Sequence, residues 1–226
     1  MSVGLAIFVK TPGYSPVKTR LAVECGQAYA ESWYRQATLA VASVAQIAGA
    51  DHDIAVHWAV AEPAAIAHDA WHGMPVLDQG EGGLGERMAH VYATLLAAHD
   101  AAMLIGADTP QLSADLLGEA ADWLRQRGPR LALGPARDGG FWLFGGNLAL
   151  PLQAWRGVHY SAAETARDLR IAMGELGQWH LLPELTDVDC ASDLPIAVRE
   201  LQRLPVLRPE QHRLLDWMLT SEGLMA

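Results

Sequence analysis

The stretch VGLAIFVKTPGYSPVKTRL, residues 3–21, contains an expected strand and the loop that follows it. Every residue from Val3 to Val9 is apolar or glycine, and a continuous apolar run of this length is typical of a strand buried on both faces of a parallel sheet. The run ends at Lys10, and the prolines and glycine that follow favour a loop. We therefore expect the chain to start in the middle of a parallel sheet and to leave it through a positively charged loop.

The same loop carries both lysines of the chain. The sequence has 16 lysines and arginines, of which only two are lysines. Ligands of open α/β sheets bind beyond the carboxyl ends of the strands, which is where this loop lies. Ammonium, hydroxyl and guanidinium groups suit a pyrophosphate, so we predict nucleotide and phosphate binding by Lys10, Lys18, Thr19 and Arg20. The alternative is a solvated turn, and the loop lacks the G-x-x-x-x-G-K-[ST] pattern of a Walker A loop.

Length and composition indicate one globular domain. The chain has 226 residues, of which 51% are hydrophobic and 19% are charged, and these values suit an α/β domain with a sizeable core. We predict a domain over residues 1–195 and a C-terminal helical tail over residues 196–226. Residues of the tail helix would pack on the same domain or on a partner subunit, so the protein would be a monomer or a homodimer.

Charge and cysteine content exclude several classes of protein. The formal net charge of −10 argues against a broad basic face for nucleic acid or an anionic membrane. Apolar stretches are far shorter than the ~20 residues that span a bilayer, and no signal peptide is evident. Cys25 and Cys190 are too few for a disulfide framework. These features predict a cytoplasmic protein that binds neither nucleic acid nor membrane.

Strand-like runs alternate with helical patterns along the chain. Such alternation predicts an α/β fold, with a mostly parallel sheet between layers of helices. The expected strands are Val3–Val9, Asp53–Val60, Met74–Leu77, Ala102–Ile105, Arg130–Leu133, Phe141–Phe144 and Trp179–Leu182. The expected helices are Gln27–Ala48, ended by Gly49, then Leu84–His99, a helix capped by Ser113, Ala162–Leu176, one ending at Leu201, and a last one starting at Pro209.

The motif LIGADTP places Asp108 directly after a buried strand, at the edge of the sheet where ligands bind. A carboxylate at this position could hold Mg²⁺, which binds through one or two carboxylates together with the phosphates of a ligand. An aspartate that merely caps the Thr-Pro turn is the alternative. A phosphate-binding loop nearby favours the metal, so we predict Asp108 as a metal ligand and catalytic residue.

The motif GPARDGGFWLFG places Asp138 and two glycines between two strand-like runs. An Asp-Gly pair between strands is the strongest short signal for a hairpin turn. Gly139 and Gly140 also allow close approach of a ligand to the backbone, and Trp142 could stack on a base or a sugar. We predict that Asp138 is catalytic and that the glycines and Trp142 contact the substrate.

The motif QGEGGLGERM contains G-x-G-x-x-G ahead of an expected helix, with Asp108 about twenty residues further on. This spacing is that of a dinucleotide-binding turn, so an NAD-dependent oxidoreductase has to be considered. However, the preceding strand is short and this is not the first strand–helix unit of the chain. We instead predict a flexible substrate loop that includes Gly82 and Gly83, with Arg87 as a phosphate contact.

The motif TDVDCASDL contains three aspartates before an expected helix. Carboxylates in this position often cap the helix and complement its dipole, so structural roles are favoured for Asp187, Asp189 and Asp193. A second metal contact, from Asp189, is the alternative. The histidines show no metal-ligand spacing, and the absence of a G-x-S-x-G motif argues against a serine hydrolase.

Taken in order, five motifs resemble those of a known family. They are KTPGYSPVKTRL, QGEGGLGERM, LIGADTPQL, GPARDGGFWLFG and DVDCASDL. They are similar to the motifs of a bacterial family of GT-A-like glycosyltransferases that is associated with radical-SAM proteins and arsenosugar biosynthesis. That family is distantly similar to 2-phospholactate guanylyltransferase and the molybdenum-cofactor nucleotidylyltransferases. The resemblance spans residues 3–195, but a shared fold does not fix the reaction.

The resemblance implies a nucleotide-diphospho-sugar transferase fold that binds a nucleotide or nucleotide-sugar with Mg²⁺ or Mn²⁺. Lys18 and Arg20 match the phosphate loop of the family, and Asp108 matches its metal-binding acid. Asp138 with the glycines after it matches a block near the acceptor or the metal. The chain departs from the family at Ser15 and Pro16, where glycine and a basic residue are usual. It also has a single acid, not Asp-x-Asp, after the central strand.

Three functions follow as hypotheses. In the first, a nucleotide-diphospho-sugar donates its sugar to a small-molecule acceptor, with Lys18 and Arg20 on the diphosphate and Asp138 at the acceptor hydroxyl. In the second, a nucleotidylyltransferase joins an NTP to a phosphorylated or acidic acceptor and releases pyrophosphate. In the third, the protein binds nucleotides without catalysis. Sugar, base and acceptor are beyond what the sequence indicates.

Overall fold

A computed structural model describes residues 1–221 and contains a seven-stranded sheet in the order β3-β2-β1-β4-β6-β5-β7. The strands are β1 (Val3–Val9), β2 (Ile54–Val60), β3 (Val76–Asp78), β4 (Ala101–Gly106), β5 (Arg130–Pro135), β6 (Phe141–Gly146) and β7 (Gln178–Leu181). Only β6 runs against its neighbours, β4 and β5. The predicted α/β class with a mostly parallel sheet is confirmed.

β1 lies at the centre of the sheet, as the apolar run predicts. It pairs in parallel with β2 on one side, from Val3–Ile54 to Val9–Val60, and with β4 on the other. Six of its seven residues are buried. Because β5 is antiparallel to β6, it runs in the same direction as β4, and so does β7. The carboxyl ends of six strands therefore lie along one edge of the sheet.

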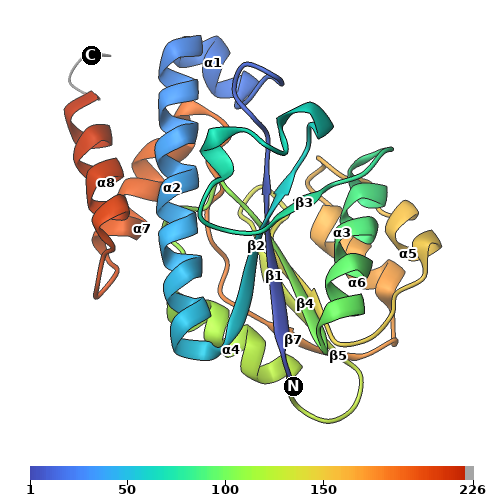
Figure 1. Cartoon of the computed structure of the whole chain (residues 1–226). Coiled ribbons are helices and arrows are strands. Elements are labelled where there is room, and N and C mark those ends of the chain that lie inside the picture. Colours follow the sequence, from blue (N-terminus) through green and yellow to red (C-terminus); the bar gives the residue numbers. More distant parts are fainter. Residues whose placement is uncertain (222–226) are drawn as a thin grey trace.

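Helices cover both faces of the sheet (Figure 1). The helices are α1 (Thr19–Cys25), α2 (Gln27–His52), α3 (Leu84–Ala98), α4 (Ala114–Leu124), α5 (Leu152–Arg156), α6 (Thr165–Met173), α7 (Leu194–Gln202) and α8 (Pro209–Ser221), with short 3₁₀ turns at Pro63–Ala65, Asp69–Trp71 and Ala191–Asp193. One apolar core lies on the side of α2 and α4, and a second lies on the side of α3, α5 and α6. The sheet is thus enclosed in three layers.

The longest helix, α2, extends past its predicted end. Gly49 was expected to stop it, but the helix continues to His52, and Asp53 ends it in the left-handed conformation with φ 53°. A Cβ on Gly49 would lie 2.9 Å from the Ile54 carbonyl oxygen. Glycine at this position therefore permits close packing of the helix on β2 and does not terminate it.

The C-terminal segment packs on the outer side of α2. Leu214 and Met218 of α8 are fully buried, and the Met218 sulfur lies 3.4 Å from the indole nitrogen of Trp33. The rings of Tyr29 and Trp217 lie 4.8 Å apart. The proposed boundary at residue 195 falls after the second residue of α7, and residues 222–226 of the predicted tail lie outside the described residues.

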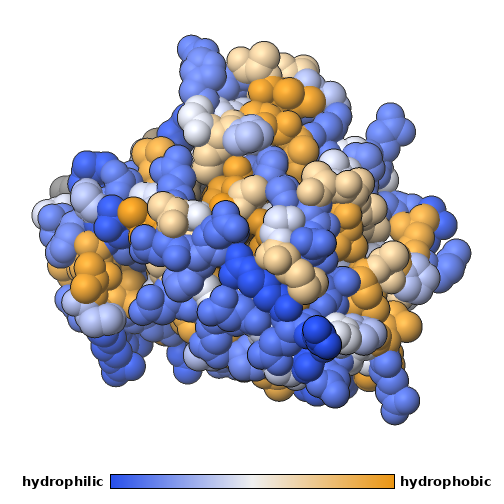
Figure 2. Space-filling view, turned by 60° about the horizontal axis from the view of Figure 1, so that its bottom comes forward, coloured by the Kyte–Doolittle hydropathy of each residue, from blue (hydrophilic) through white to orange (hydrophobic). Residues whose placement is uncertain are grey.

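The surface is a mixture of polar and apolar groups. Figure 2 shows hydrophilic residues over most of one face, with hydrophobic residues in several separate groups among them. Among the described residues, no helix combines the length and the apolar character that crossing a membrane requires.

Candidate active site

The first loop is anchored at its base to the elements beside it. The Thr11 carbonyl accepts hydrogen bonds from the backbone N–H groups of Tyr14 and Ser15, which closes a turn. The Thr11 N–H donates to Glu62 at 2.9 Å, and the Lys10 N–H donates to the Tyr34 hydroxyl at 2.9 Å. These bonds fix the loop against α2 and against the segment after β2. They position Lys18, at the far end of the loop, over the edge of the sheet.

Lys18 points into the protein and joins two carboxylates. Its Nζ lies 2.7 Å from Asp108 Oδ2 and 2.7 Å from Asp189 Oδ1, and its side chain is only 6% exposed. Burial on its own lowers the pKa of Lys18, but the charges and hydrogen bonds of both carboxylates outweigh burial and raise that pKa above its ordinary value. Lys18 is therefore a buried ammonium held between two acids.

The backbone at Lys18 is unusual. Its φ of 46° and ψ of 49° lie in the left-handed region, directly before α1. A residue with a Cβ adopts this conformation at a cost of about 1–3 kcal/mol, and such residues cluster at functional sites. In this chain, the conformation accompanies a side chain that reaches two carboxylates from distant parts of the sequence.

Asp108 follows β4 and faces Lys18, as the sequence predicted for an acid at the carboxyl edge. Its carbonyl accepts a hydrogen bond from the Val188 N–H at 3.2 Å, which joins the segment after β7 to the end of β4. A Cβ on Gly106 would lie 2.6 Å from Asp108 Oδ1. Glycine at this position leaves room for the carboxylate to lie over the end of its own strand.

Two further carboxylates, those of Asp138 and Asp187, converge with Asp189 and form an acidic cluster. Oxygen atoms of Asp138, Asp187 and Asp189 all lie within 4.8 Å of one another. Asp187 Oδ1 is buried and has no hydrogen-bond partner among the described residues. Burial raises the pKa of the Asp187 carboxyl to about 7, and the negative charges of its acidic neighbours add to this effect. Burial also acts on Asp189, but Lys18 outweighs it and lowers the pKa of that carboxyl.

These carboxylates fit a divalent metal ion. Mg²⁺ and Mn²⁺ prefer carboxylate oxygens, and a buried carboxylate oxygen without a partner is unfavourable unless a cation or water satisfies it. Asp187 and Asp189 form an Asp-x-Asp pair. The sequence prediction placed the metal at Asp108 and considered Asp189 as a second contact, but it assigned Asp187 a structural role. The Asp-x-Asp spacing was the sequence signal that could have identified Asp187 as a candidate metal ligand.

Asp193 has the structural role that the sequence predicted. Its Oδ2 accepts hydrogen bonds from the backbone N–H groups of Asp189 and Cys190 at 2.9 and 2.8 Å. The Glu24 carboxylate accepts another from the Ala191 N–H at 2.7 Å. These bonds hold the segment that carries the acidic residues in place before α7.

The other residues of the motif KTPGYSPVKTRL that were predicted to contact phosphate are Lys10, Thr19 and Arg20, and they differ in whether they contact an aspartate of the site. Arg20 is 67% exposed, and one guanidinium nitrogen lies 3.6 Å from Asp189 Oδ2. Thr19 is exposed in the first turn of α1. Lys10 is also exposed, and its side chain forms no ion pair with any described residue. The structure thus brings Lys18 and Arg20 to Asp189 of the acidic cluster, whereas Lys10 forms no ion pair with any of its residues.

The motif with Asp138 forms the hairpin between β5 and β6. Asp138 Oδ1 accepts a hydrogen bond from the Gly140 N–H at 2.7 Å within the turn. Gly139 has φ 89°, and a Cβ there would lie 1.9 Å from the Ala163 carbonyl oxygen. Both glycines therefore have a structural explanation: they form the turn and bring it against the segment before α6.

Trp142 does not face the site. It is 2% exposed in the core under α2, and its indole N–H donates to the Pro183 carbonyl at 3.1 Å. The expectation that it stacks on a base or sugar is corrected, because the alternation of β6 directs this ring into the core.

The glycine-rich loop after β3 is held by its own contacts. The Gly83 N–H donates to the Glu86 carboxylate at 2.8 Å, and Arg156 also pairs with Glu86 at 2.7 Å. The Arg87 side chain donates to the Gly82 carbonyl at 3.1 Å. Gln79 binds the carbonyls of the neighbouring strands β1 and β2, so the loop does lie at the carboxyl edge. Because β3 is an edge strand, the loop is not the central turn of a dinucleotide fold.

Comparison with known families agrees with this architecture. Residues 39–162, more than half of the chain, match the family described as "Uncharacterized protein conserved in bacteria (DUF2064)". The chain belongs to this family. No curated protein matches the sequence. The predicted association with radical-SAM proteins and arsenosugar biosynthesis stays a prediction.

Solved structures share this fold, and two of those described below are transferases by description. A "putative nucleotide-diphospho-sugar transferase" from Desulfovibrio desulfuricans G20 matches with a TM-score of 0.82 and 26% identity over 98% of each chain. A 4-diphosphocytidyl-2C-methyl-D-erythritol synthase from Anaerococcus prevotii has a TM-score of 0.56 and 9% identity, covering 89% of this chain and 99% of that one. A Methanothermobacter nucleotidyl transferase has a TM-score of 0.54 and 13% identity, covering 90% and 99%. The predicted nucleotide-diphospho-sugar transferase fold is confirmed.

Proposed function

We propose that this DUF2064 protein is a metal-dependent transferase that acts on a nucleotide substrate. The observation that carries the proposal is the contact of Lys18 with Asp108 and Asp189, beside the acidic cluster, at the carboxyl edge of β1 and β4. A buried ammonium next to several carboxylates provides binding groups for a phosphate anion and for a cation at adjacent positions. Metal-bound nucleotides need both.

The residues divide into two sets. Lys18, Thr19 and Arg20 would bind the phosphates, with Lys18 as a compact charge and Arg20 as a planar fork. Asp187 and Asp189 would hold the metal together with Asp138, whose oxygens converge with theirs, or with Asp108, which shares Lys18 with Asp189. A bound Mg²⁺ or Mn²⁺ would neutralise the negative charge that develops on the leaving phosphate.

For the donor, we favour a nucleotide-diphospho-sugar. The likeness to the Desulfovibrio protein supports this choice, because it covers 98% of both chains. In this reaction an acceptor hydroxyl oxygen forms a bond to the anomeric carbon, and the bond from that carbon to the diphosphate oxygen breaks. The hydroxyl proton passes to a carboxylate, for which Asp138 is suited because it is exposed at the rim of the cluster.

Nucleotidylyl transfer is the second candidate. The nucleotidyl transferase from Methanothermobacter, which shares the fold, favours it. An acceptor oxygen would then attack the α-phosphorus of an NTP, and the bond to the pyrophosphate oxygen would break. Lys18 would neutralise the phosphate in either reaction, so the difference lies in the product.

Product analysis tests and separates the two reactions. The full chain would be incubated with a panel of NTPs and nucleotide-diphospho-sugars in Mn²⁺ or Mg²⁺, and thermal shifts would identify the nucleotide that binds. Release of a free nucleoside diphosphate from a sugar donor supports glycosyl transfer, whereas release of pyrophosphate supports nucleotidylyl transfer. Tight nucleotide binding that is indifferent to metal and gives no product would contradict both.

Two aspartate variants make the test specific to the site. Asp189→Asn removes a carboxylate that contacts Lys18 and belongs to the acidic cluster. Asp69→Asn removes a carboxylate that is 94% exposed in a short turn after β2. We expect the first variant to lose the metal-dependent thermal shift and the second to retain it. Equal behaviour of the two variants would exclude the acidic cluster as the metal site.

A further inference from the structure

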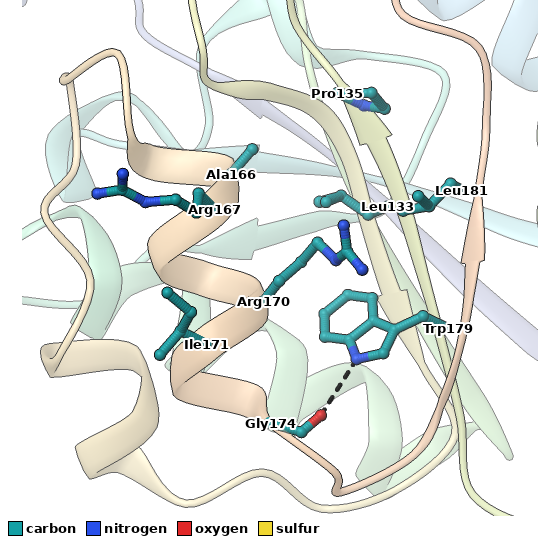
Figure 3. Close-up of a pocket in the computed structure, with 9 residues that line it drawn as sticks. All are labelled: Leu133, Pro135, Ala166, Arg167, Arg170, Ile171, Gly174, Trp179 and Leu181. Atoms are coloured by element: carbon teal, nitrogen blue, oxygen red, sulfur yellow. Dashed lines mark hydrogen bonds between the residues drawn. The ribbon is translucent and has the colours of Figure 1, made fainter.

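A pocket opens between α6 and the strands β5 and β7. Its cavity volume is about 560 Å³, within the range of about 300–1,000 Å³ that small-molecule sites have. The residues that line it include Leu133, Pro135, Ala166, Trp179 and Leu181, together with Arg167 and Arg170 of α6. Most of these side chains are apolar, and Figure 3 shows that they face one another across the gap between helix and strands.

The two arginines of α6 beside this pocket differ in direction and in partners. Figure 3 shows Arg170 extending from the helix toward Trp179 and the strands, whereas Arg167 extends to the opposite side of the helix. Arg167 pairs with Asp168 at 3.2 Å. The guanidinium of Arg170, an exposed residue, forms no hydrogen bond or ion pair with any described residue. A guanidinium with free donors thus lies at an apolar pocket of a chain whose net charge is −10.

All three walls of the pocket lead into the acidic cluster. β5 ends at Pro135, three residues before Asp138. The chain continues from β7 to Asp187, and on the way Leu185 forms a bridge with Ala136. On the third wall, the Ala166 N–H donates to the Gly139 carbonyl at 2.8 Å. Since three residues span at most ~11 Å, a ligand in the pocket could also reach Asp138.

We propose that this pocket binds the acceptor, and that the acceptor is a hydroxy acid with an apolar body. The body would pack between Leu133 and Trp179, and its carboxylate would pair with Arg170. Its hydroxyl, at the other end, would lie at Asp138. This inference rests on the proposed transferase function. It adds the chemical class of the acceptor, which the acidic cluster alone does not indicate.

Calorimetric titration with a defined probe tests the proposal. 3-(4-Hydroxyphenyl)propionate combines an apolar ring, a hydroxyl and a carboxylate, and its amide is the uncharged control. We expect the acid to bind at one site and the amide to bind about tenfold more weakly, because a charge-assisted hydrogen bond contributes about 1.5–3 kcal/mol. Ala166→Phe, which fills the pocket, should weaken both compounds. Equal affinity for the acid and the amide would overturn the proposal.

The two arginines provide a matched pair of variants. Arg170→Gln should reduce the affinity for the acid to that for the amide, and Arg167→Gln should leave it within about twofold of the unmodified protein. If both variants bind the acid equally, Arg170 is not the carboxylate partner and the proposal is wrong.

Nucleotide thermal shifts on the same variants separate this proposal from the function on which it rests. A normal nucleotide shift without binding of the acid would contradict the pocket alone. Binding of the acid in a protein that binds no nucleotide would contradict the acceptor role. Circular dichroism of each variant would show that the fold is intact, so that a loss of binding reports on the pocket.

Discussion

The ammonium of Lys18 lies where a metal ion would also be attracted. Its Nζ is 2.7 Å from both Asp108 and Asp189, and Asp189 is shared with the acidic cluster. Two cations so close together would repel each other strongly at low effective dielectric. Lys18 would therefore move from the carboxylates to a phosphate when metal and nucleotide bind together. In this way one residue would couple the binding of both ligands.

This coupling predicts opposite effects of one substitution. Lys18→Met should strengthen Mn²⁺ binding in the absence of nucleotide, because the carboxylates lose their internal cation. It should weaken nucleotide binding by at least about tenfold, because a charged hydrogen bond of about 1.5–3 kcal/mol is lost. Calorimetric titration with Mn²⁺ and then with nucleotide measures both effects. Lys10→Met changes the other lysine, which is exposed, and should alter Mn²⁺ binding little. Weaker Mn²⁺ binding in Lys18→Met would contradict the coupling.

Asp187 shows how a ligand site can reduce the stability of the free protein. Its buried oxygen has no partner among the described residues, and its pKa is raised to about 7 from an ordinary value of 3.8. Because the folded protein binds this proton more tightly than the unfolded chain, the carboxyl lowers the free energy of unfolding as pH rises from about 4 to 7.

Asp187→Asn should consequently stabilise the metal-free protein at pH 8. We expect a rise in Tm of about 2–4 °C, the shift that about 1 kcal/mol produces in a chain of this length. At pH 4 the difference should vanish, because the carboxyl is then protonated in the folded protein. Thermal unfolding in EDTA at both pH values measures this effect, and added Mn²⁺ should stabilise only the unmodified protein. A lower Tm for the variant at pH 8 would contradict the prediction.

At the scale of elements, the strands were the most predictable part of the chain. Six of the seven predicted strands start within one residue of the observed ones. Continuous apolar runs identify buried strands such as β1 and β4 directly. Short helices were missed: α1 and α5 have seven and five residues and little apolar periodicity. The helix predicted over Ala162–Leu176 is shorter, Thr165–Met173. Packing against neighbours determines such short elements, and a sequence pattern does not show it.

The hairpin between β5 and β6 allows a test at this scale. Gly139→Ala would place a Cβ at 1.9 Å from the Ala163 carbonyl oxygen, in addition to the strain of φ 89°. Gly128→Ala has nearly the same φ, 86°, with no atom within 4 Å of the new Cβ. The second variant should lower Tm by about 2–4 °C, which is the cost of the conformation alone. The first should lower it further and should also weaken Mn²⁺ binding, because the turn carries Asp138. Equal Tm values would show that the contact with Ala163 is unimportant.

At the scale of the whole molecule, the site is assembled from segments far apart in the sequence. Lys18 and Asp108 are 90 residues apart, and Lys18 and Asp189 are 171 residues apart. The sequence could indicate that Lys18 and Asp108 meet, because both follow strands of a parallel sheet. The Asp-x-Asp spacing could have drawn attention to Asp187, but it could not indicate that Asp187 lies beside Asp138, because the path of the chain after β7 depends on the bridge between Ala136 and Leu185. For the same reason, the sequence could not indicate the pocket beside α6, which residues of β5, α6 and β7 form together.

Because the residues of the site come from distant parts of the chain, ligand binding should stabilise the fold as a unit. A ligand at 100 times its dissociation constant adds about 2.7 kcal/mol to the free energy of unfolding, which corresponds to a rise in Tm of about 5–11 °C for a chain of this size. We expect this rise with nucleotide and Mn²⁺ together, and a much smaller one with nucleotide in EDTA, because Lys18 then remains bound to Asp108 and Asp189. Scanning calorimetry should show a single transition that moves as a whole. A second transition that does not respond to ligand would mean that part of the chain, such as α7 and α8, unfolds independently of the site.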